Sequence, residues 1–275
     1  MTQPSTIATK PSYADVVDLD KYPINDLASE RGQAFVQACR EELAENGACN
    51  LPGFIRPEAV AAMVDLAGEL REEAWTSSRP HTVYFEQVDE TVPAEHPLAH
   101  QVRSVKHGIA FDYIHETSPM SRLYASDDLT RFIAAVLQKP VLYRSADPLD
   151  ALQVTAMNDG DELGWHFDRS EFSITVMYQQ PEEGGEFYYH PGLRSEDNPN
   201  YEGVQRVLQG DTTGQKLLPS APGTLAFFHG TNALHHVTPV KGSTPRINSV
   251  LTYGERDDMK LNDLTSMLFY GRTSA

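Results

Sequence analysis

Residues 171–190 read EFSITVMYQQPEEGGEFYYH. Two segments rich in β-branched and aromatic residues flank a short turn that contains Pro and Gly, a composition typical of β-strands joined by a loop. We interpret PEEGG as the loop of a β-hairpin. The segment therefore predicts antiparallel β-structure.

Similar short segments with a period of two recur between residues 141 and 256, separated by clusters of Gly, Pro, Asn and Asp. They are VLYR, ALQVTAMN, GTLAFFHG, ALHHVTPV and RINSVLTYGE, in addition to the two segments quoted above. About seven short strands at this spacing favour an antiparallel sandwich or barrel. The polar segment 191–215 interrupts the pattern, and we expect a loop insertion there, of the kind that can cover a site.

The first half of the chain has a helical period instead. Apolar positions predict an amphipathic helix near 31–46, another that begins at Pro57, and a third with Ser126 as its N-cap that ends before Pro140. We expect the first two helices to pack on a sheet. The predicted organisation is a single domain, 1–275, with a helical support region (1–140), a β core (141–256) and a C-terminal tail (257–275).

Charge and composition exclude several classes of partner. A formal net charge of -17 disfavours a nucleic-acid substrate, because phosphate contacts need clustered Lys and Arg. Two cysteines without a CxxC pair indicate neither a zinc knuckle nor a disulfide framework. Residues 1–14 lack the pattern of a secretory signal, and no apolar run approaches the ~20 residues that span a bilayer. We therefore expect a cytoplasmic protein without membrane contact, and the sequence allows a homodimer.

One segment, GDELGWHFDRSEF (160–172), carries the residues for metal chemistry. His166 and Asp168 are two residues apart, so on a strand both side chains point to the same face. A histidine from ALHHVTPV (233–240) is the candidate third ligand, and two imidazoles with one carboxylate form the facial triad typical of non-haem iron(II) oxygenases. Zinc is disfavoured because catalytic zinc sites keep only one open position. An isolated His-x-Asp is more often an exposed strand pair, and five histidines without a partner at ligand spacing are interpreted as ordinary: His100, His107, His115, His190 and His229.

Taken together, GWHFD, GGEF, PGTLAFFHG, HHVTPV and PRINSV resemble, in this order, segments of the iron(II)- and 2-oxoglutarate-dependent dioxygenases. The resemblance covers about residues 150–254 and is strongest to the prolyl-hydroxylase-like branch, close to free amino-acid hydroxylases and related radical halogenases. It implies an α+β protein built on a double-stranded β-helix, a jelly-roll or cupin-like barrel, with supporting N-terminal helices. It also implies Fe(II), 2-oxoglutarate and O2 as cofactor and cosubstrates.

The same resemblance distinguishes His235 from its neighbour His236. The family pattern His-x-Val-x-Pro places the ligand at His235, with Val237 and Pro239 in phase. Adjacent strand residues face opposite sides, so His236 is expected to lie behind the metal or to point outward.

Arg246, eleven residues after His235, matches the arginine that pairs with the distal carboxylate of 2-oxoglutarate in that family. A guanidinium suits this role because its planar fork binds a carboxylate with two hydrogen bonds. The alternative is a surface arginine near a turn. Thr252, in phase with Arg246, is expected to help line the pocket. Met157 departs from the pattern, since many relatives have a cosubstrate-binding tyrosine near this point.

By the same resemblance, the expected reaction is hydroxylation of an unactivated C–H bond as 2-oxoglutarate is converted to succinate. Radical halogenases have Gly or Ala where this chain has Asp168, so hydroxylation is favoured over chlorination. The resemblance implies a small-molecule substrate, a free amino acid or a derivative. Arg103 is the expected partner of its carboxylate, while Tyr270 and Arg272 are expected to close over the pocket.

Each of these substrate residues has an alternative: Arg103 can be a solvated side chain, and the end of the chain can be an exposed tail. Two rival functions also remain open. A protein-residue hydroxylase of the prolyl type would share the chemistry but needs an open peptide groove. A cupin-like metal-binding protein that is no oxygenase would have no reason for Arg246.

Overall fold

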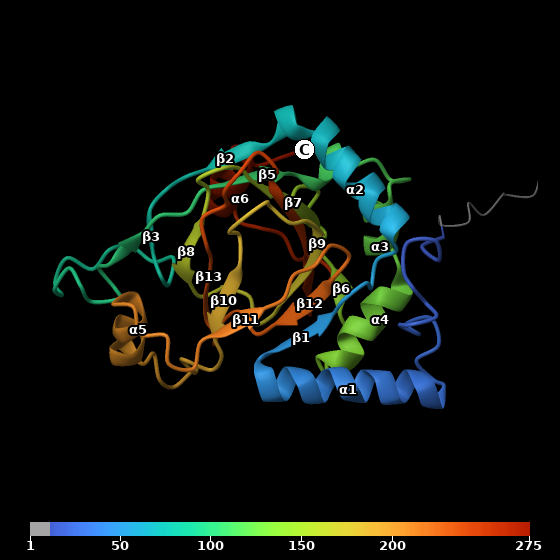
Figure 1. Ribbon diagram of the computed structural model, residues 1–275, viewed down its shortest axis with the longest axis horizontal. Helices are drawn as coiled ribbons and strands as arrows, with labels where there is room; N and C mark the ends of the chain where they lie inside the picture. Colours follow the sequence, from blue (N-terminus) through green and yellow to red (C-terminus); the bar gives the residue numbers. More distant parts are fainter. Residues whose placement is uncertain (1–11) are drawn as a thin grey trace, which may run out of the picture.

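Two antiparallel sheets form the centre of the structure, a computed structural model that describes residues 12–275 (Figure 1). Most of the N-terminal stretch 1–14, for which no secretory signal is predicted, lies outside the described residues. The larger sheet has the order β1-β12-β9-β14-β7-β5-β2 and the smaller sheet β11-β10-β13-β8. The predicted combination of helices with large antiparallel sheets is confirmed.

The strands of the larger sheet, in spatial order, are β1 (Ala48–Leu51), β12 (Leu225–Phe228), β9 (Ser173–Gln179), β14 (Arg246–Leu251), β7 (Leu152–Met157), β5 (Lys106–Ile109) and β2 (Trp75–Ser77). Those of the smaller sheet are β11 (Lys216–Leu218), β10 (Phe187–His190), β13 (Leu234–Val237) and β8 (Leu163–His166). Two ribbons pair β15 (Tyr253–Gly254) with β6 (Tyr143–Arg144), and β3 (His81–Thr82) with β4 (Gln101–Val102).

The two faces of the larger sheet differ in character because successive side chains alternate between them. One face packs apolar residues into the main core together with the helices; its members include Leu152, Val154, Ile174, Val176, Leu225, Phe227, Ile247 and Leu251. The residues between them point to the other face, which we call the inner face, and many are polar: Lys106, Gln153, Thr155, Ser173, Thr175, Arg246 and Asn248. A strand face with so many polar residues is unusual for a core and indicates a functional site.

The chain before β5 joins the two sheets. Ser104 forms a β-bridge with Leu163 of β8, and Val105 N donates to Glu162 O at 2.8 Å. Gly164 N donates to Arg103 O at 2.9 Å, and a side chain at Gly164 would collide with the same carbonyl. One edge of the smaller sheet is therefore bonded to the segment that continues into the larger sheet.

The helices are α1 (Glu30–Asn46), α2 (Pro57–Glu69), α3 (Pro119–Tyr124), α4 (Asp127–Val136), α5 (Tyr201–Leu208) and α6 (Asp263–Tyr270), with 3-10 turns η1 (Arg71–Glu73) and η2 (Phe111–Tyr113). The three helices predicted from the sequence are α1, α2 and α4. Ser126 caps α4 by accepting from Leu129 N, and Gly47 ends α1 with a left-handed φ of 71°. Helices α1 to α4 lie along one side of the sheets (Figure 1), where Phe132 of α4 packs edge-on against Phe227 of β12.

The PEEGG turn is not a hairpin loop, so that prediction is wrong. Strand β9 pairs with β12 and β14, whereas β10 pairs with β11 and β13 of the other sheet. The turn crosses between the sheets: Glu183 bridges Lys241, and Gly184 and Gly185 have φ of 73° and 70°. A Cβ at Gly184 would lie 1.9 Å from Pro239 O, which excludes any side chain there. Local composition predicts the turn, but pairing is determined by distant strands.

Three segments contain more regular structure than the sequence predicted. Residues 1–140 contribute β1, β2 and β5 to the larger sheet, 191–215 contain α5, and 257–275 contain α6. Helix α5 packs its Val204 and Val207 near Phe167, the residue between His166 and Asp168. Across residues 12–275, no helix combines the length and apolarity that a bilayer crossing requires.

Candidate metal centre

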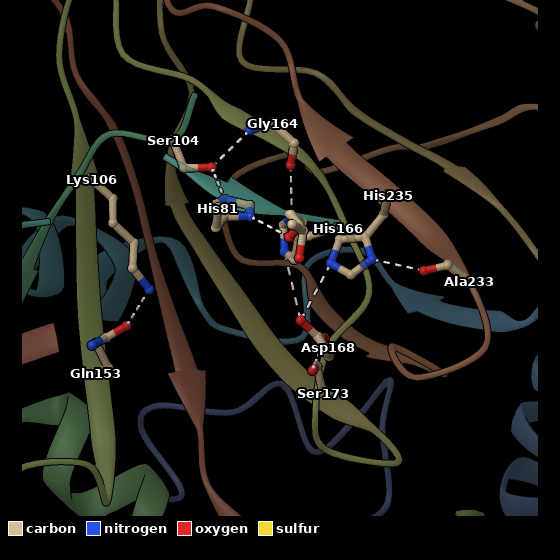
Figure 2. A network of polar contacts seen from close by, with 11 residues as sticks. His81, Ser104, Lys106, Gln153, Gly164, His166, Asp168, Ser173, Ala233 and His235 are labelled. Atoms are coloured by element: carbon tan, nitrogen blue, oxygen red, sulfur yellow. Dashed lines mark hydrogen bonds and ion pairs between the residues drawn. The ribbon is translucent and has the colours of Figure 1, made fainter. Parts of the chain in front are cut away.

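His166, Asp168 and His235 converge at one end of the smaller sheet (Figure 2). His166 is the last residue of β8, and His235 lies opposite it in the register of β13. Asp168 Oδ1 lies 3.7 Å from His166 Nε2 and 3.4 Å from His235 Nε2. One ligand atom from each residue fits within 4.8 Å of the other two. The spacing of two residues and the pairing of two strands together produce this cluster.

Backbone carbonyls fix the orientation of both imidazoles. His166 Nδ1 donates to Gly164 O at 2.7 Å and His235 Nδ1 donates to Ala233 O at 2.9 Å. A carbonyl can only accept, so Nδ1 carries the proton and each Nε2 keeps its lone pair toward Asp168. Burial, with the neighbouring His235, lowers the pKa of His166 to about 3. His166 is therefore neutral near pH 7, as a metal ligand must be.

Asp168 is held through both its side chain and its backbone. Its Oδ2 accepts from Ser173 Oγ of β9 at 2.6 Å, and its backbone N donates to Gly230 O at 3.0 Å. Burial alone would raise the pKa of this carboxyl, but the adjacent His235 and His166 and the Ser173 hydrogen bond lower it overall. Asp168 is therefore charged, with one oxygen aimed between the imidazoles.

This donor set fits a divalent first-row metal. Two neutral imidazoles and one carboxylate on a single side leave the remaining positions to small ligands, the arrangement typical of non-haem Fe(II). Aromatic rings pack against His235: Phe187 stacks on it at 5.2 Å between ring centroids, and Phe228 meets the same ring edge-on at 4.8 Å.

His236 points away from this cluster, as the strand alternation predicts. Its ring stacks on Trp165 at 3.8 Å between centroids and lies near Tyr188. Burial lowers its pKa to about 4. Of the two adjacent histidines, only His235 joins the cluster.

Arg246, the first residue of β14, is buried on the inner face at 5% exposure. Its Nε donates to Gly185 O at 3.1 Å and its Nη1 donates to Asn248 Oδ1 at 2.5 Å. Burial lowers its pKa to about 10. Gly185 precedes Phe187, the first residue of β10, by two positions, and Phe187 stacks on His235. The guanidinium and the metal cluster therefore contact the same short segment of the chain. Among residues 12–275, no carboxylate forms an ion pair with Arg246, which leaves an uncompensated buried cation.

The sequence matches a family model described as "HalD: Halogenase D" over residues 31–267. This chain belongs to the Halogenase D family. No match to curated proteins reaches significance.

Among solved structures, a 2OG-Fe(II) oxygenase family member from Burkholderia pseudomallei is 17% identical, with coverage of 81% of this chain and 92% of that chain and a TM-score of 0.50. The alpha-ketoglutarate-dependent epimerase SnoN from nogalamycin biosynthesis is 16% identical, with 80% and 81% coverage and a TM-score of 0.55. AviO1 from Streptomyces viridochromogenes Tue57 is 16% identical, with 82% and 97% coverage and a TM-score of 0.54. At these identities the likeness establishes the fold. With the family match, it confirms the predicted resemblance to 2-oxoglutarate- and iron-dependent oxygenases and their halogenase relatives.

None of the other residues predicted for the site contacts the metal cluster of this Halogenase D family member. Thr252 follows β14, six residues or about 20 Å of strand from Arg246. Its Oγ1 lies 3.3 Å from Asp150 Oδ2, while Tyr270 OH donates to Asp150 Oδ1 at 2.6 Å. Thr252 and Tyr270 thus both bind Asp150. The residue on the same face of β14 that does contact Arg246 is Asn248, two positions further along the strand.

Arg103 and Arg272 are paired with surface carboxylates. Arg103 Nη1 lies 3.0 Å from Glu162 Oε1 with a side chain 55% exposed. Arg272 binds Asp112 through both terminal nitrogens, at 2.8 and 2.7 Å. A cavity of about 250 Å³ includes Tyr270 and Arg272 in its lining, but none of the metal cluster. Neither arginine reaches the triad here, and their roles toward substrate stay predictions.

Several residues that lie around the site belong to no recognisable sequence motif. His81 approaches His166 edge-on at 6.1 Å between ring centroids and contacts Ser104 Oγ at 2.7 Å. Ser173 and Gly230 hold Asp168 from separate strand ends, and only the tertiary pairing brings them there. The inner-face position of Ser173 on β9 could have suggested a polar role, because polar residues in phase along a buried strand need partners.

Proposed function

We propose that this protein is an iron(II)- and 2-oxoglutarate-dependent oxygenase that hydroxylates a C–H bond of a small molecule, a free amino acid or a derivative. The observation that carries the proposal is the convergence of His166, Asp168 and His235, with ligand atoms within 4.8 Å of one another. When bound, the metal, O2 and 2-oxoglutarate supply the oxidation, with succinate and carbon dioxide as coproducts. The protein holds the metal on one side and positions the reacting groups.

In this proposal Arg246 binds the distal carboxylate of 2-oxoglutarate. A buried guanidinium without an ion pair has donors free for an anion, and an anion would offset the cost of its burial. Asn248 and Gly185 hold two of its nitrogens in place, which orients the fork. The rival reading of Arg246 as a surface residue does not agree with its 5% exposure.

Hydroxylation is proposed rather than chlorination, although the family is described as a halogenase family. Chlorination requires a metal position that a halide can occupy, and here Asp168 Oδ1 points to the space between both Nε2 atoms. Ser173 Oγ donates to the other oxygen of this carboxylate, so the side chain cannot swing away without loss of that hydrogen bond. Bound in this position, the carboxylate takes the place of a halide.

We infer that the two sheets form a double-stranded β-helix within a single domain, with residues 141–256 as its core. The supporting observation is strand order: β7, β9, β12 and β14 belong to the larger sheet and β8, β10, β11 and β13 to the smaller one. The chain therefore alternates between the sheets from β7 to β14 except at β10 and β11, which are neighbours in the smaller sheet. This order places β8, β13 and β14, the strands of the proposed site, around the inner face.

A small-molecule substrate is supported by SnoN, which was solved in complex with Fe3+, alpha ketoglutarate and nogalamycin RO. The amino-acid assignment rests on the sequence resemblance and on the polar inner face. A homodimer and a cytoplasmic location remain predictions.

The test is anaerobic titration of Fe(II) and 2-oxoglutarate, followed in the visible charge-transfer absorbance that a chelating 2-oxo acid produces on ferrous iron. Succinate formation in air with a panel of amino acids, with and without chloride, then measures turnover. His235→Ala should abolish both signals, and His236→Ala is the matched control that should retain the absorbance. Absence of the absorbance in the wild-type protein would favour a metal-binding protein that is no oxygenase, and a chlorinated product would overturn the choice of reaction.

A further inference from the structure

Arg194 is the side chain through which the 191–215 insertion contacts the segment of the metal ligands. The insertion, with its helix α5, lies beside the smaller sheet, on the side opposite α2 and α4 (Figure 1). The guanidinium carbon of Arg194 lies 4.1 Å from the ring centroid of Phe167, the residue between His166 and Asp168. A residue from a predicted loop insertion is therefore in direct contact with the His-x-Asp segment.

Phe167 belongs to a stack of three groups on the outer face of the smaller sheet. Its ring is nearly parallel to that of Tyr84, with 5.5 Å between centroids and 13° between planes, and Arg194 lies over both rings. Phe167 shares an apolar cluster with Leu234, the strand neighbour of the ligand His235. Because adjacent strand residues face opposite sides, this stack lies on the face turned away from the metal cluster.

Arg194 is also bonded to the turn 229–233. Its Nε donates to Thr231 O at 2.5 Å, and its backbone N donates to Asn232 O at 3.3 Å. The Nε donor lies in the guanidinium plane, so one planar group stacks its face on the rings and directs its edge to the turn. No ion pair within residues 12–275 includes Arg194, and Glu86 adds only attraction at longer range. The guanidinium therefore serves the stack and the turn rather than a salt bridge.

The turn 229–233 carries contacts that orient two of the three ligands. Gly230 O accepts from Asp168 N at 3.0 Å, and Ala233 O accepts from His235 Nδ1 at 2.9 Å. A displacement of the turn would move both carbonyls. The backbone of one ligand and the ring orientation of the other would then change together, and such outer contacts determine how well ligands bind a metal.

We propose that Arg194 is a positioning residue of the metal centre, which fixes the geometry of the ligands from the outer face of the smaller sheet. It acts on the His-x-Asp segment through the ring of Phe167, and on the turn through Thr231 O. Ligands function as a set only when the residues behind them are themselves held in place. The inference rests on the metal centre of the proposed function and gives the 191–215 insertion a role in it.

The experiment replaces Arg194 and measures metal geometry and affinity separately. The visible ligand-field absorbance of the Co(II)-loaded protein reports the arrangement of the donor atoms, and competition with a chromophoric chelator measures affinity. Arg194→Met should change the Co(II) spectrum and weaken Co(II) binding by about 10- to 100-fold, the range for loss of groups that orient ligands. Arg194→Lys should change the spectrum as well, because an ammonium keeps the charge but lacks the planar fork. Ethylguanidinium, but not ethylammonium, should restore part of the affinity of Arg194→Ala.

Arg206→Met is the matched control, because Arg206 lies on α5 of the same insertion with a side chain 61% exposed. It should bind Co(II) with the wild-type spectrum and affinity. Urea unfolding of the metal-free variants measures their stability. If Arg194→Met does not fold, Arg194→Lys decides the question, since it keeps a cation over the rings.

Wild-type Co(II) spectra and affinities in the folded Arg194 variants would overturn the inference. So would a loss of affinity that follows the loss of stability while the spectrum stays unchanged, because Arg194 would then only support the fold. A wild-type protein that binds no Co(II) would contradict the metal centre and this inference with it. Normal Co(II) binding without the 2-oxoglutarate absorbance on Fe(II) would reject the proposed oxygenase alone.

Discussion

Gly230 shows how closely the metal cluster is built. A Cβ at this position would lie 2.1 Å from Asp168 Oδ2 and 2.6 Å from Asp168 Cβ, so even alanine displaces the carboxylate. We expect Gly230→Ala to weaken Fe(II) affinity by about 10- to 100-fold, the range for loss of groups that orient metal ligands. Competition with a chromophoric chelator measures this affinity. Gly68→Ala is the control, because nothing lies within 4 Å of its Cβ; equal affinities in both variants would contradict the packing argument.

Asp150 gives a pH-dependent prediction. Burial raises its pKa to about 6, although the hydrogen bond from Tyr270 opposes the shift. An unfolded carboxyl titrates near about 3.9, so between about pH 4 and about pH 6 the folded state binds more protons and the free energy of unfolding falls as pH rises. Asp150→Asn removes this loss, and its Oδ1 can still accept from Tyr270. Urea unfolding at several pH values measures the difference in free energy of unfolding between the variant and the wild type. This difference should grow in favour of the variant from about pH 4 to about pH 6 and stay constant at higher pH. A difference that does not change across that range would contradict the raised pKa of Asp150.

The sequence predicted individual metal-cluster residues where the spacing along the chain translates directly into the face of a strand. His166 and Asp168 share a strand face through their separation of two, and the His-x-Val-x-Pro pattern distinguished His235 from His236. Thr252 shows the limit of the same reasoning, because phase gives the face but not the position along the strand. Lys106 and Gln153 carry no motif, since their contact depends on the pairing of β5 with β7.

Helix α4 is the element that its own sequence specifies most completely. Ser126 Oγ accepts from Leu129 N at 3.2 Å, and Asp127 and Asp128 occupy the first turn. We expect Ser126→Ala to lower the free energy of unfolding by about 1 kcal/mol, because the cap is lost, and Ser126→Thr to retain most of it. Urea denaturation measures the change. Ser274→Ala, near the exposed end of the chain, should leave it unaltered; an equal loss in Ser126→Thr would contradict a capping role.

The elements missed by sequence reasoning are those that distant partners stabilise. Strands β1, β2 and β5 are short, and β1 exists as a strand because it pairs with β12 about 180 residues later along the chain, with Cys49 opposite Phe227. The same cause explains the wrong hairpin: β9 finds its partners in β12 and β14 rather than in the next segment. Caps and periodicity are local and predictable, whereas sheet membership is not.

At the scale of the whole molecule, the proposed ligands lie on both sheets. His166 and His235 belong to the smaller sheet and Arg246 to the larger one. A 2-oxoglutarate molecule that chelates the metal and pairs with Arg246 would therefore link the sheets. Because it binds only the folded state, about 100-fold excess over its dissociation constant should add about 2.7 kcal/mol to the free energy of unfolding.

Replacement of Arg246 should therefore have opposite effects on the stability of the ligand-free protein and on the binding of 2-oxoglutarate. Without ligand, Arg246→Met should be at least as stable as the wild type, because it removes a buried cation that lacks a counter-charge. With Fe(II), thermal unfolding of the wild type should shift upward with 2-oxoglutarate concentration, while the variant needs roughly 10- to 100-fold more for the same shift. Glutarate is the matched ligand control, since it has both carboxylates but no oxo group to chelate the metal. The stabilisation requires both ends of one molecule to be held at once, one by the metal and one by Arg246. A thermal shift of equal size with glutarate would therefore mean that the two sheets are not joined through this ligand. An unchanged 2-oxoglutarate response in Arg246→Met would mean the same.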